Sequence, residues 1–213
     1  KLNFVSFLLC LTGILAFGQN KIDLKADFNM ETHEIKISQT IQYKNTSNQD
    51  LKTIYLSDWI NSYSTKKTPL AQRLADEYNN KFHLAKNEDR GYSVIASIRQ
   101  NGEYLSFEQL KDQIDIIKVN LQAPLKPEES YKIDLEYTVK IPNNKFTSYG
   151  VTPTGDFNLR YWYITPAVFN GEWQYYSNKN LDDLFVPKSD ISLEIKCPKA
   201  YKVTSELNVI ETK

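Results

Sequence analysis

The sequence predicts an all-β fold, an antiparallel sandwich or saddle with one inserted helix. Apolar and polar residues alternate over 22–28, 35–43 and 131–141, a pattern typical of strands with one buried and one wet face. Asn101-Gly102 is a strong signal for a tight hairpin turn. A single stretch, which begins after Thr68, carries apolar residues at helical spacing.

The N-terminus has the features of a secretory signal peptide. An almost wholly apolar run extends from Phe4 to Phe17, and Ala16-Phe17-Gly18 is a small-x-small cleavage site. The run is shorter than the roughly 20 residues that a membrane span needs, although a retained N-terminal anchor is the alternative. We therefore expect residues 1–18 to be removed. The mature domain, 19–213, is expected to be exported to the periplasm, the cell surface or the medium, with no membrane span.

The first three strands are expected over 22–28, 35–43 and 51–56, joined by short polar turns. A helical insertion of about 62–92 follows them. The helix is expected near 69–82.

The helix signal consists of a cap and an apolar stripe. Thr68 is a suitable N-cap and Pro69 suits the first helical position. Leu70, Leu74 and Tyr78 recur every four residues, so we expect them to share the buried face. The remaining strands are expected over 94–99, 103–107, 117–121, 131–141, 191–197, 201–204 and 207–210.

Charge and cysteine content exclude several classes of protein. Lys and Arg together number 26 and Asp and Glu also number 26, so no charge excess indicates a nucleic-acid or anionic-membrane partner. Cys10 leaves with the signal peptide, and a single cysteine forms no internal disulfide. Cys197 continues the apolar side of a strand, so we expect a buried, inert thiol.

Candidate metal ligands and catalytic groups are few. His33-Glu34 begins like the zinc motif H-E-x-x-H, but Ile37 occupies the fifth position, and His83 follows the helix. Carboxylate pairs such as Asp112 with Asp115, and the pair 182–183, are expected on solvated loops. There is no G-x-S-x-G elbow and no phosphate-binding glycine loop. We therefore expect no catalytic residue, metal ligand or cofactor in this chain.

The stretch 157–176 is the most aromatic part of the chain. It holds eight of the 27 aromatic residues, and its charges are limited to Arg160 and Glu172. So much aromatic area is used either in a core or at an interface, and composition does not distinguish the two. If the run before Pro166 is a strand, then Tyr161 and Tyr163 lie on one face and Trp162 on the other.

Several segments, taken in order, resemble the N-terminal domain of gluzincin metallopeptidases of the aminopeptidase N type. They are I-D-L-K-A-D-F (22–28), I-Q-Y-K-N-T-S (41–47), L-K-T-I-Y-L (51–56), the turn A-P-L-K-P-E-E (123–129) with the strand 131–141 after it, Trp162-Tyr163 with Pro166 and then Gly171-Glu172-Trp173, and 190–198 followed by 201–203.

The resemblance implies a β saddle that packs against a thermolysin-like catalytic domain. That domain carries the zinc ion and the H-E-x-x-H motif, which residues 1–213 lack, so the chain is expected to be part of a longer product and to be inactive by itself. The partners implied are this downstream catalytic domain and, through the parent protein, a peptide substrate.

In the family a glutamine near the substrate amine precedes the tryptophan-tyrosine pair, and Arg160 and Tyr161 stand there in this chain. The candidate residues of the substrate cleft or of the domain interface are therefore Arg160, Tyr161, Trp162, Tyr163 and Trp173. The alternative is a free-standing exported module that binds a glycan or a protein through Trp162, Trp173 and Tyr175.

Overall fold

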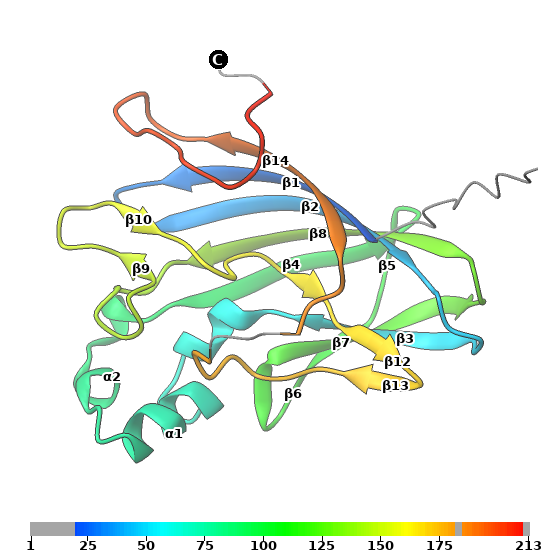
Figure 1. Cartoon of the computed structure of the whole chain (residues 1–213), viewed down its shortest axis with the longest axis horizontal. Coiled ribbons are helices and arrows are strands. Elements are labelled where there is room, and N and C mark those ends of the chain that lie inside the picture. The colour runs from blue at the N-terminus through cyan, green and yellow to red at the C-terminus, as the bar shows by residue number, and fades with distance from the viewer. Residues whose placement is uncertain (1–19, 182–184, 211–213) are drawn as a thin grey trace, which may run out of the picture.

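The computed structural model describes residues 20–181 and 185–210, and its architecture is all-β, as the alternation predicts (Figure 1). The signal peptide expected over 1–18 lies outside the described residues. The strands are β1 (Asn20–Asn29), β2 (Glu34–Lys44), β3 (Leu51–Ser57), β4 (Tyr92–Gln100), β5 (Glu103–Tyr104), β6 (Phe107–Leu110), β7 (Gln113–Leu125), β8 (Ser130–Lys140), β9 (Gly150–Val151), β10 (Phe157–Asn158), β11 (Thr165–Pro166), β12 (Val168–Asn170), β13 (Glu172–Gln174) and β14 (Ser189–Lys196).

Two main sheets face each other, with the helical segments at one end (Figure 1). The larger sheet has the order β14-β1-β2-β8-β4-β5, and the smaller has the order β11-β3-β7-β6. Their pairings are antiparallel except for β1 with β14, which run parallel. Two short ribbons, β10-β9 and β12-β13, come from the aromatic stretch and the loop before it.

The core lies between the two sheets and is built by the predicted alternation. In β1 the side chains of Ile22, Leu24 and Ala26 are buried, while Lys21 and Lys25 face water. The same period of two buries every second residue along most of β2 and β8. Burying an aliphatic side chain contributes about 1.5–3 kcal/mol, so these three strands hold the fold together.

The hairpin turn at Asn101-Gly102 joins β4 to β5 as predicted. Both residues have a positive φ, 53° and 84°, which is the backbone of a type I′ turn. The returning strand β5 is shorter than the predicted 103–107, because a separate strand, β6, begins at Phe107 and pairs with the other sheet.

The insertion between β3 and β4 contains two α-helices, where one helix was predicted, and two short 3-10 helices. It comprises η1 (Trp59–Tyr63), α1 (Pro69–Asp76), α2 (Lys81–Leu84) and η2 (Asn87–Asp89). The predicted cap is confirmed, since the Thr68 hydroxyl accepts a hydrogen bond of 3.2 Å from the backbone N–H of Ala71. Leu70 and Leu74 are buried as expected.

The predicted position of Tyr78 on the buried helix face is wrong. The chain turns into the left-handed region at Tyr78 (φ 57°), and the side chain is 91% exposed. The backbone N–H of Asn79 donates to the carbonyl of Leu74, which closes the end of α1 before a continuous helix to residue 82 can form.

The two strands predicted over 201–204 and 207–210 do not form, because these residues pair with no neighbouring strand in the described structure and are exposed. Cys197 is likewise half-buried and not buried, since it follows the edge strand β14. The apolar residues of β14, Ile191 and Leu193 among them, are also half-buried. This edge of the large sheet is therefore incompletely covered.

Gly150, in β9, is a position where a side chain is expected to damage the fold. Its φ is 134°, and a Cβ atom there would lie 2.2 Å from the backbone carbonyl oxygen of Pro142. We expect Gly150→Ala to lower the free energy of unfolding by about 2–3 kcal/mol, because backbone strain and a backbone clash combine. Urea unfolding of the variant and the parent measures this loss.

The matched control is Gly102→Ala. Gly102 also has a positive φ, 84°, but a Cβ atom there would have nothing within 4 Å. The control should lose about 1 kcal/mol from the backbone conformation alone. Equal losses in the two variants would show that the loop around Gly150 moves to accommodate the added methyl group with no further loss of stability.

Candidate functional site

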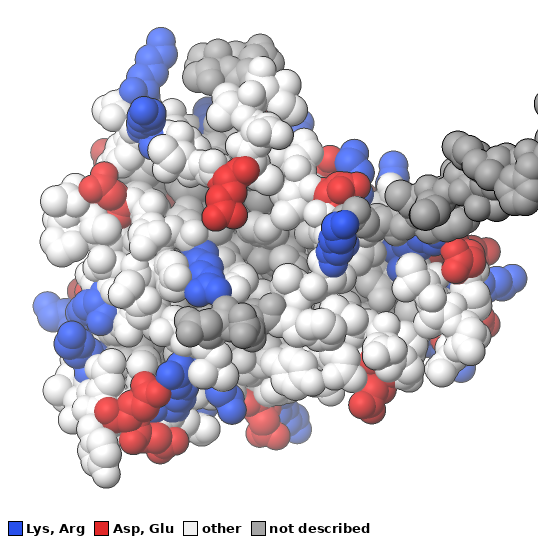
Figure 2. Space-filling view, viewed as in Figure 1, with Lys and Arg blue, Asp and Glu red and all other residues white. Residues whose placement is uncertain are grey.

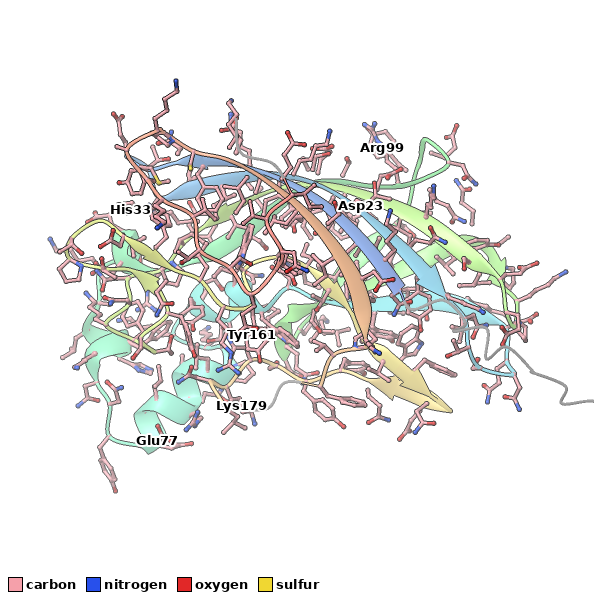
Figure 3. The ribbon with its side chains drawn as sticks, turned by 45° about the horizontal axis from the view of Figure 1, so that its top comes forward. Asp23, His33, Glu77, Arg99, Tyr161 and Lys179 are labelled. Carbon is pink, nitrogen blue, oxygen red and sulfur yellow. The ribbon has the colours of Figure 1, made fainter. Side chains whose placement is uncertain are left out.

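The chain between β10 and β11 is irregular, so the strand considered for the run before Pro166 does not form. Tyr161 adopts a left-handed backbone (φ 53°), which removes the strict alternation of faces expected for residues 161–163. Figure 3 labels Tyr161 within this segment. The chain becomes regular again at β11, where Thr165 pairs with Ser57 of β3.

A buried polar network fixes this irregular segment to the large sheet. Gln39, the one polar residue on the inner face of β2, donates from Nε2 to the carbonyl of Ile164 at 2.6 Å. The Tyr137 hydroxyl of β8 donates to Gln39 Oε1 and accepts from the backbone N–H of Ile164. A buried polar group lowers stability unless it is paired. The network therefore fixes the backbone conformation of the residues around Ile164.

Trp162 is a core residue. It is 8% exposed, and its ring lies 5.8 Å from that of Phe28 and 5.4 Å from that of Tyr163, centroid to centroid. Tyr163 is half-buried, and burial raises the pKa of its hydroxyl. Trp162 is therefore not available as an exposed binding residue of a free-standing module.

Arg160 and Tyr161 form a second group with Tyr149. The Arg160 guanidinium donates to the Tyr149 hydroxyl at 3.1 Å and to the Tyr161 hydroxyl at 2.8 Å, and its Cζ lies 4.6 Å from the Tyr161 ring centroid. The Tyr161 ring in turn meets Trp59 edge to face at 4.9 Å. Two tyrosines thus orient one cation, an arrangement that cation–π attraction stabilises.

The hollow beside Arg160 is small. It has a volume of about 10 Å³ and is bounded by Tyr63, Tyr149 and Gly150, among others. This is room for about one water molecule, so a peptide side chain does not fit there as the chain stands.

Trp173 belongs to a separate aromatic group on the β12-β13 hairpin. Its ring lies 5.2 Å from Phe169, 5.6 Å from Tyr55 and 5.9 Å from Tyr43. Tyr175 stacks on Tyr55 at 4.6 Å with an interplanar angle of 12°. The structure therefore divides the five candidate residues into three groups: Arg160 with Tyr161, Trp162 with Tyr163, and Trp173 over the small sheet. Their role at a cleft or a domain interface stays a prediction.

Two buried carboxyl groups beside this stretch were missed by the sequence analysis. Asp58 follows β3 and is 1% exposed, and Asp115 lies in β7 and is fully buried, so the expected solvated loop at Asp115 is wrong. The backbone N–H of Asp58 donates to the carbonyl of Asp115 at 2.8 Å. The apolar run Ile114-Asp115-Ile116-Ile117 was the available signal, because a charge inside such a run is buried with its neighbours.

Burial determines the protonation of both groups. It raises the pKa of Asp58 to about 7, although the Ser93 hydroxyl donates to this carboxyl and favours its charged form, and nearby Asp115 adds to the rise. Burial also raises the pKa of Asp115 to about 6 against hydrogen bonds from Ser177 and Asn178.

Metal-binding groups do not gather in the described structure. Among residues 20–181 and 185–210, no three His, Cys, Asp or Glu side chains are placed to hold a metal ion. His33 lies in the turn between β1 and β2 (Figure 3), with its ring 5.9 Å from that of Phe157. Within the same described residues, no helix has the length and apolar character needed to cross a membrane.

The surface carries mixed charge. On the face shown in Figure 2, blue Lys and Arg side chains are interspersed with red Asp and Glu side chains. An open groove of about 370 Å³ crosses the outer face of the large sheet, and its charged lining has both signs, Lys36 and Glu136 among them.

No protein-family model matches the sequence, and no curated protein matches it. Among solved structures, the chain is similar to an M1 zinc metallopeptidase mutant from Deinococcus radiodurans, with 15% identity and a TM-score of 0.34 over 57% of this chain and 20% of that one.

A two-domain M1 zinc metallopeptidase mutant bound to L-arginine gives 15% identity and a TM-score of 0.34 over 57% and 19% of the two chains. The same kind of mutant bound to L-tryptophan gives 16% and 0.33 over 58% and 21%. This chain thus spans about a fifth of the length of the structures it matches. The likeness is too loose to assign the chain to their family.

Proposed function

We propose that this chain is the non-catalytic N-terminal domain of an exported, aminopeptidase-like zinc metallopeptidase. It packs on a downstream catalytic domain, which holds the zinc ion, and helps to shape the cleft that takes a peptide substrate. The observation that carries the proposal is the order in which the family-like sequence segments fall on the strands of the two sheets.

Five of the six segments lie on strands or at strand ends. I-D-L-K-A-D-F lies in β1, I-Q-Y-K-N-T-S ends β2, and L-K-T-I-Y-L lies in β3. The turn A-P-L-K-P-E-E joins β7 to β8, and residues 190–196 of the last segment lie in β14. The remaining segment does not fit in the same way, because Trp162-Tyr163 lies in the irregular chain before β11, and residues 201–203, which follow β14, form no strand.

Partly covered apolar surface supports a neighbouring domain. Ile191 and Leu193 of β14 are half-buried, whereas the apolar residues of β1 beside them are buried. Val203 and Val209, in the segment after β14, are exposed. Exposed apolar area of this kind is typical of a surface that another unit covers. The surface that contacts the catalytic domain would then include the β14 edge as well as the half-buried Tyr163.

The proposal predicts the content of the reading frame that follows codon 213. We expect it to encode H-E-x-x-H within the next few hundred codons, and the whole product to retain about one zinc ion per chain and to hydrolyse peptide substrates. Residues 19–213 produced alone should retain no zinc after dialysis and should cleave no aminoacyl anilide. Metal analysis and a peptidase assay of both products measure this.

The control is the whole product with the glutamate of its H-E-x-x-H replaced, which should keep zinc and lose activity. A stop codon directly after Lys213, or zinc-free hydrolysis by the whole product, would contradict the proposal. The first of these outcomes would favour an exported binding module that uses Trp173 and Tyr175.

A further inference from the structure

The connection between β13 and β14 begins with a strap, residues Tyr176–Asn180, which crosses the ends of β3 and β7. Side chains of the body of the protein hold it. The indole N–H of Trp59 donates to the carbonyl of Tyr176 at 2.9 Å. The Asn178 amide donates to the Ser62 hydroxyl at 3.1 Å. Ser177 and Asn178 are buried, so the strap is seated in the protein and not laid over it.

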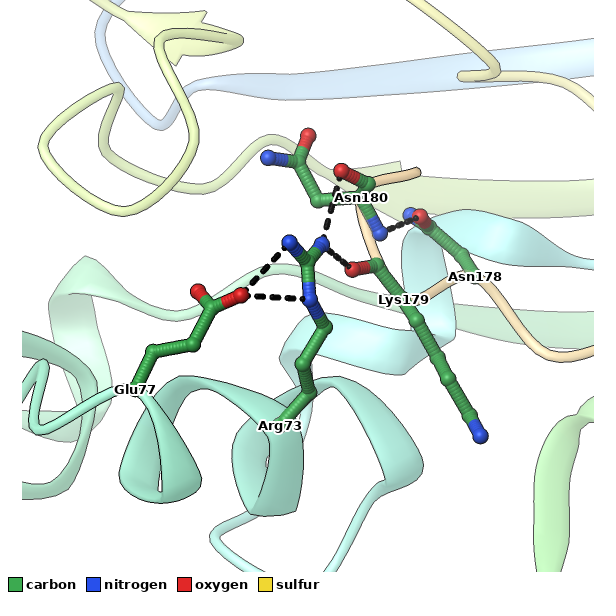
Figure 4. Close-up of polar contacts among 5 residues, drawn as sticks. All are labelled: Arg73, Glu77, Asn178, Lys179 and Asn180. Atoms are coloured by element: carbon green, nitrogen blue, oxygen red, sulfur yellow. Dashed lines mark hydrogen bonds and ion pairs between the residues drawn. The ribbon is translucent and has the colours of Figure 1, made fainter. Parts of the chain in front are cut away.

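Arg73 of helix α1 binds the C-terminal end of the strap (Figure 4). Arg73 donates from Nη1 to the carbonyls of Lys179 and Asn180, the second at 2.8 Å. Glu77 holds the guanidinium in place by accepting from Nε at 3.0 Å and from Nη2 at 2.7 Å. Within the strap, the N–H of Asn180 donates to Asn178 Oδ1 at 2.8 Å.

The centre of the strap rests on Asp115. The Ser177 hydroxyl donates to Asp115 Oδ1 and the backbone N–H of Asn178 donates to Oδ2, both at 2.7 Å. Both carboxyl oxygens are therefore covered by the strap, and Asp115 is fully buried while the strap is in place. Lifting the strap would remove both donors and admit water to the carboxyl group.

We propose that Asp115 and the strap form a proton-linked latch, which is held closed when Asp115 is protonated and opens more often once Asp115 ionises. The driving force is the cost of a buried charge. An ionised Asp115 beneath the closed strap lacks solvation, and an ionised Asp115 beneath an open strap regains it. The latch is a property of this chain itself and does not depend on the proposed function.

The two donors of the strap oppose this direction, because they favour the charged form of Asp115, but burial outweighs them and the net change in its pKa is upward. Asp58 faces it from the end of β3, but burial raises the Asp58 pKa to about 7, so this second carboxyl group is mostly uncharged in the range where Asp115 titrates. Tyr137 of β8, whose hydroxyl lies in the network with Gln39, interacts with Asp58 and Tyr163 and carries no charge at neutral pH. The cation of the latch, Arg73, is paired with Glu77 and contacts strap carbonyls, not Asp115.

The linkage gives the direction and size of the effect. The pKa of Asp115 is about 6 in the closed state, and an exposed aspartate has a pKa of about 3.9. The closed strap therefore binds the proton more tightly, so opening becomes easier as pH rises from about 4 to 6 and changes little above that range. Two pKa units correspond to an increase of about a hundredfold in the opening equilibrium.

Hydrogen exchange of the strap amides in the whole protein tests the latch. After division by the intrinsic exchange rate, protection of the Asn178 and Asn180 amides should fall about a hundredfold between pH 4 and pH 7 and then level off. The reference amides are those of Ile133 and Leu135 in β8, which pair with β2 in the core. The free energy of global unfolding also falls as pH rises, so the reference amides lose protection too. Strap amides that are less protected than the reference amides show that the strap opens without unfolding. Equal protection of the two sets at every pH would mean that the strap opens only when the protein unfolds and would overturn the latch.

Three variants assign the effect to Asp115. Asp115→Asn should abolish the pH dependence of strap protection. Ser177→Ala removes a hydrogen bond that lowers the Asp115 pKa, so it should move the transition to higher pH. Ser93→Ala is the matched control, because Ser93 donates to Asp58 and not to Asp115, and it should leave the midpoint unchanged.

If Asp115→Asn does not fold, the two serine variants still test whether the pH dependence comes from Asp115. A midpoint that moves with Ser93→Ala and not with Ser177→Ala, or a transition that persists in Asp115→Asn, would overturn the assignment.

Discussion

Replacing Trp59 with alanine is expected to lower the free energy of unfolding by about 4 kcal/mol, because truncating a buried tryptophan removes its packing and leaves a cavity. Trp59 is 2% exposed and is among the largest fully buried side chains. Its indole packs edge to face on Tyr161 and donates to the carbonyl of Tyr176. The variant thus loses core packing, an aromatic contact and one anchor of the strap together. Urea unfolding followed by tryptophan fluorescence and circular dichroism measures the loss.

Two controls separate these contributions. Trp59→Phe keeps most of the packing and loses the hydrogen bond, so it should cost about 1–2 kcal/mol. Trp173→Ala makes the same truncation at a half-buried site and should cost less than Trp59→Ala. Equal losses at Trp59 and Trp173 would show that the hairpin β12-β13 is as important to the core as the chain that follows β3.

The second large effect is a fall in stability as pH rises, which Asp58→Asn should reduce. The Asp58 pKa is about 7 in the folded protein and about 3.9 when the chain is unfolded. Between these values the folded protein binds more protons than the unfolded chain, so the free energy of unfolding decreases as pH rises from about 4 to 7. For Asp58 alone the decrease is about 4 kcal/mol.

Asparagine has the same shape and carries no charge at any of these pH values. At pH 8, Asp58→Asn should therefore be more stable than the parent, and at pH 4 the two should be similar. A smaller slope between pH 4 and 6 should persist in the variant, because the pKa of Asp115 is raised to about 6. Unfolding by urea at pH 4, 6 and 8 checks this.

The control for Asp58→Asn is Asp27→Asn, at an exposed site that pairs with Lys196 on the outer face of the large sheet. It should leave the pH profile of stability unchanged, since surface ion pairs contribute little. Parallel profiles for the parent and Asp58→Asn would mean that water or a local movement relieves the buried charge at Asp58.

The sequence by itself determined the strands whose pattern is local. Alternation in β1, β2 and β8 follows from a period of two residues, and the turn at Asn101-Gly102 follows from residues that accept a positive φ. The Thr68 cap is local in the same way, since its partner is three residues away. These features need no knowledge of what lies across the core.

Only the tertiary structure decided features that depend on partners far along the chain. β14 pairs in parallel with β1, about 170 residues earlier, whereas residues 201–210 carry a similar alternation and find no partner in the described structure. The path around Ile164 is set by Gln39 and Tyr137, because buried backbone groups must be paired wherever a donor or acceptor is within reach.

The same distinction between local and long-range features applies to the candidate site. Composition identified the aromatic stretch 157–176, but not that Trp162 packs in the core while Trp173 lies over the small sheet. Composition also could not show that Asp115 lies beneath the strap with Asp58 beside it. A residue type reports what a side chain prefers, and its burial and its pKa depend on which distant segments fold over it.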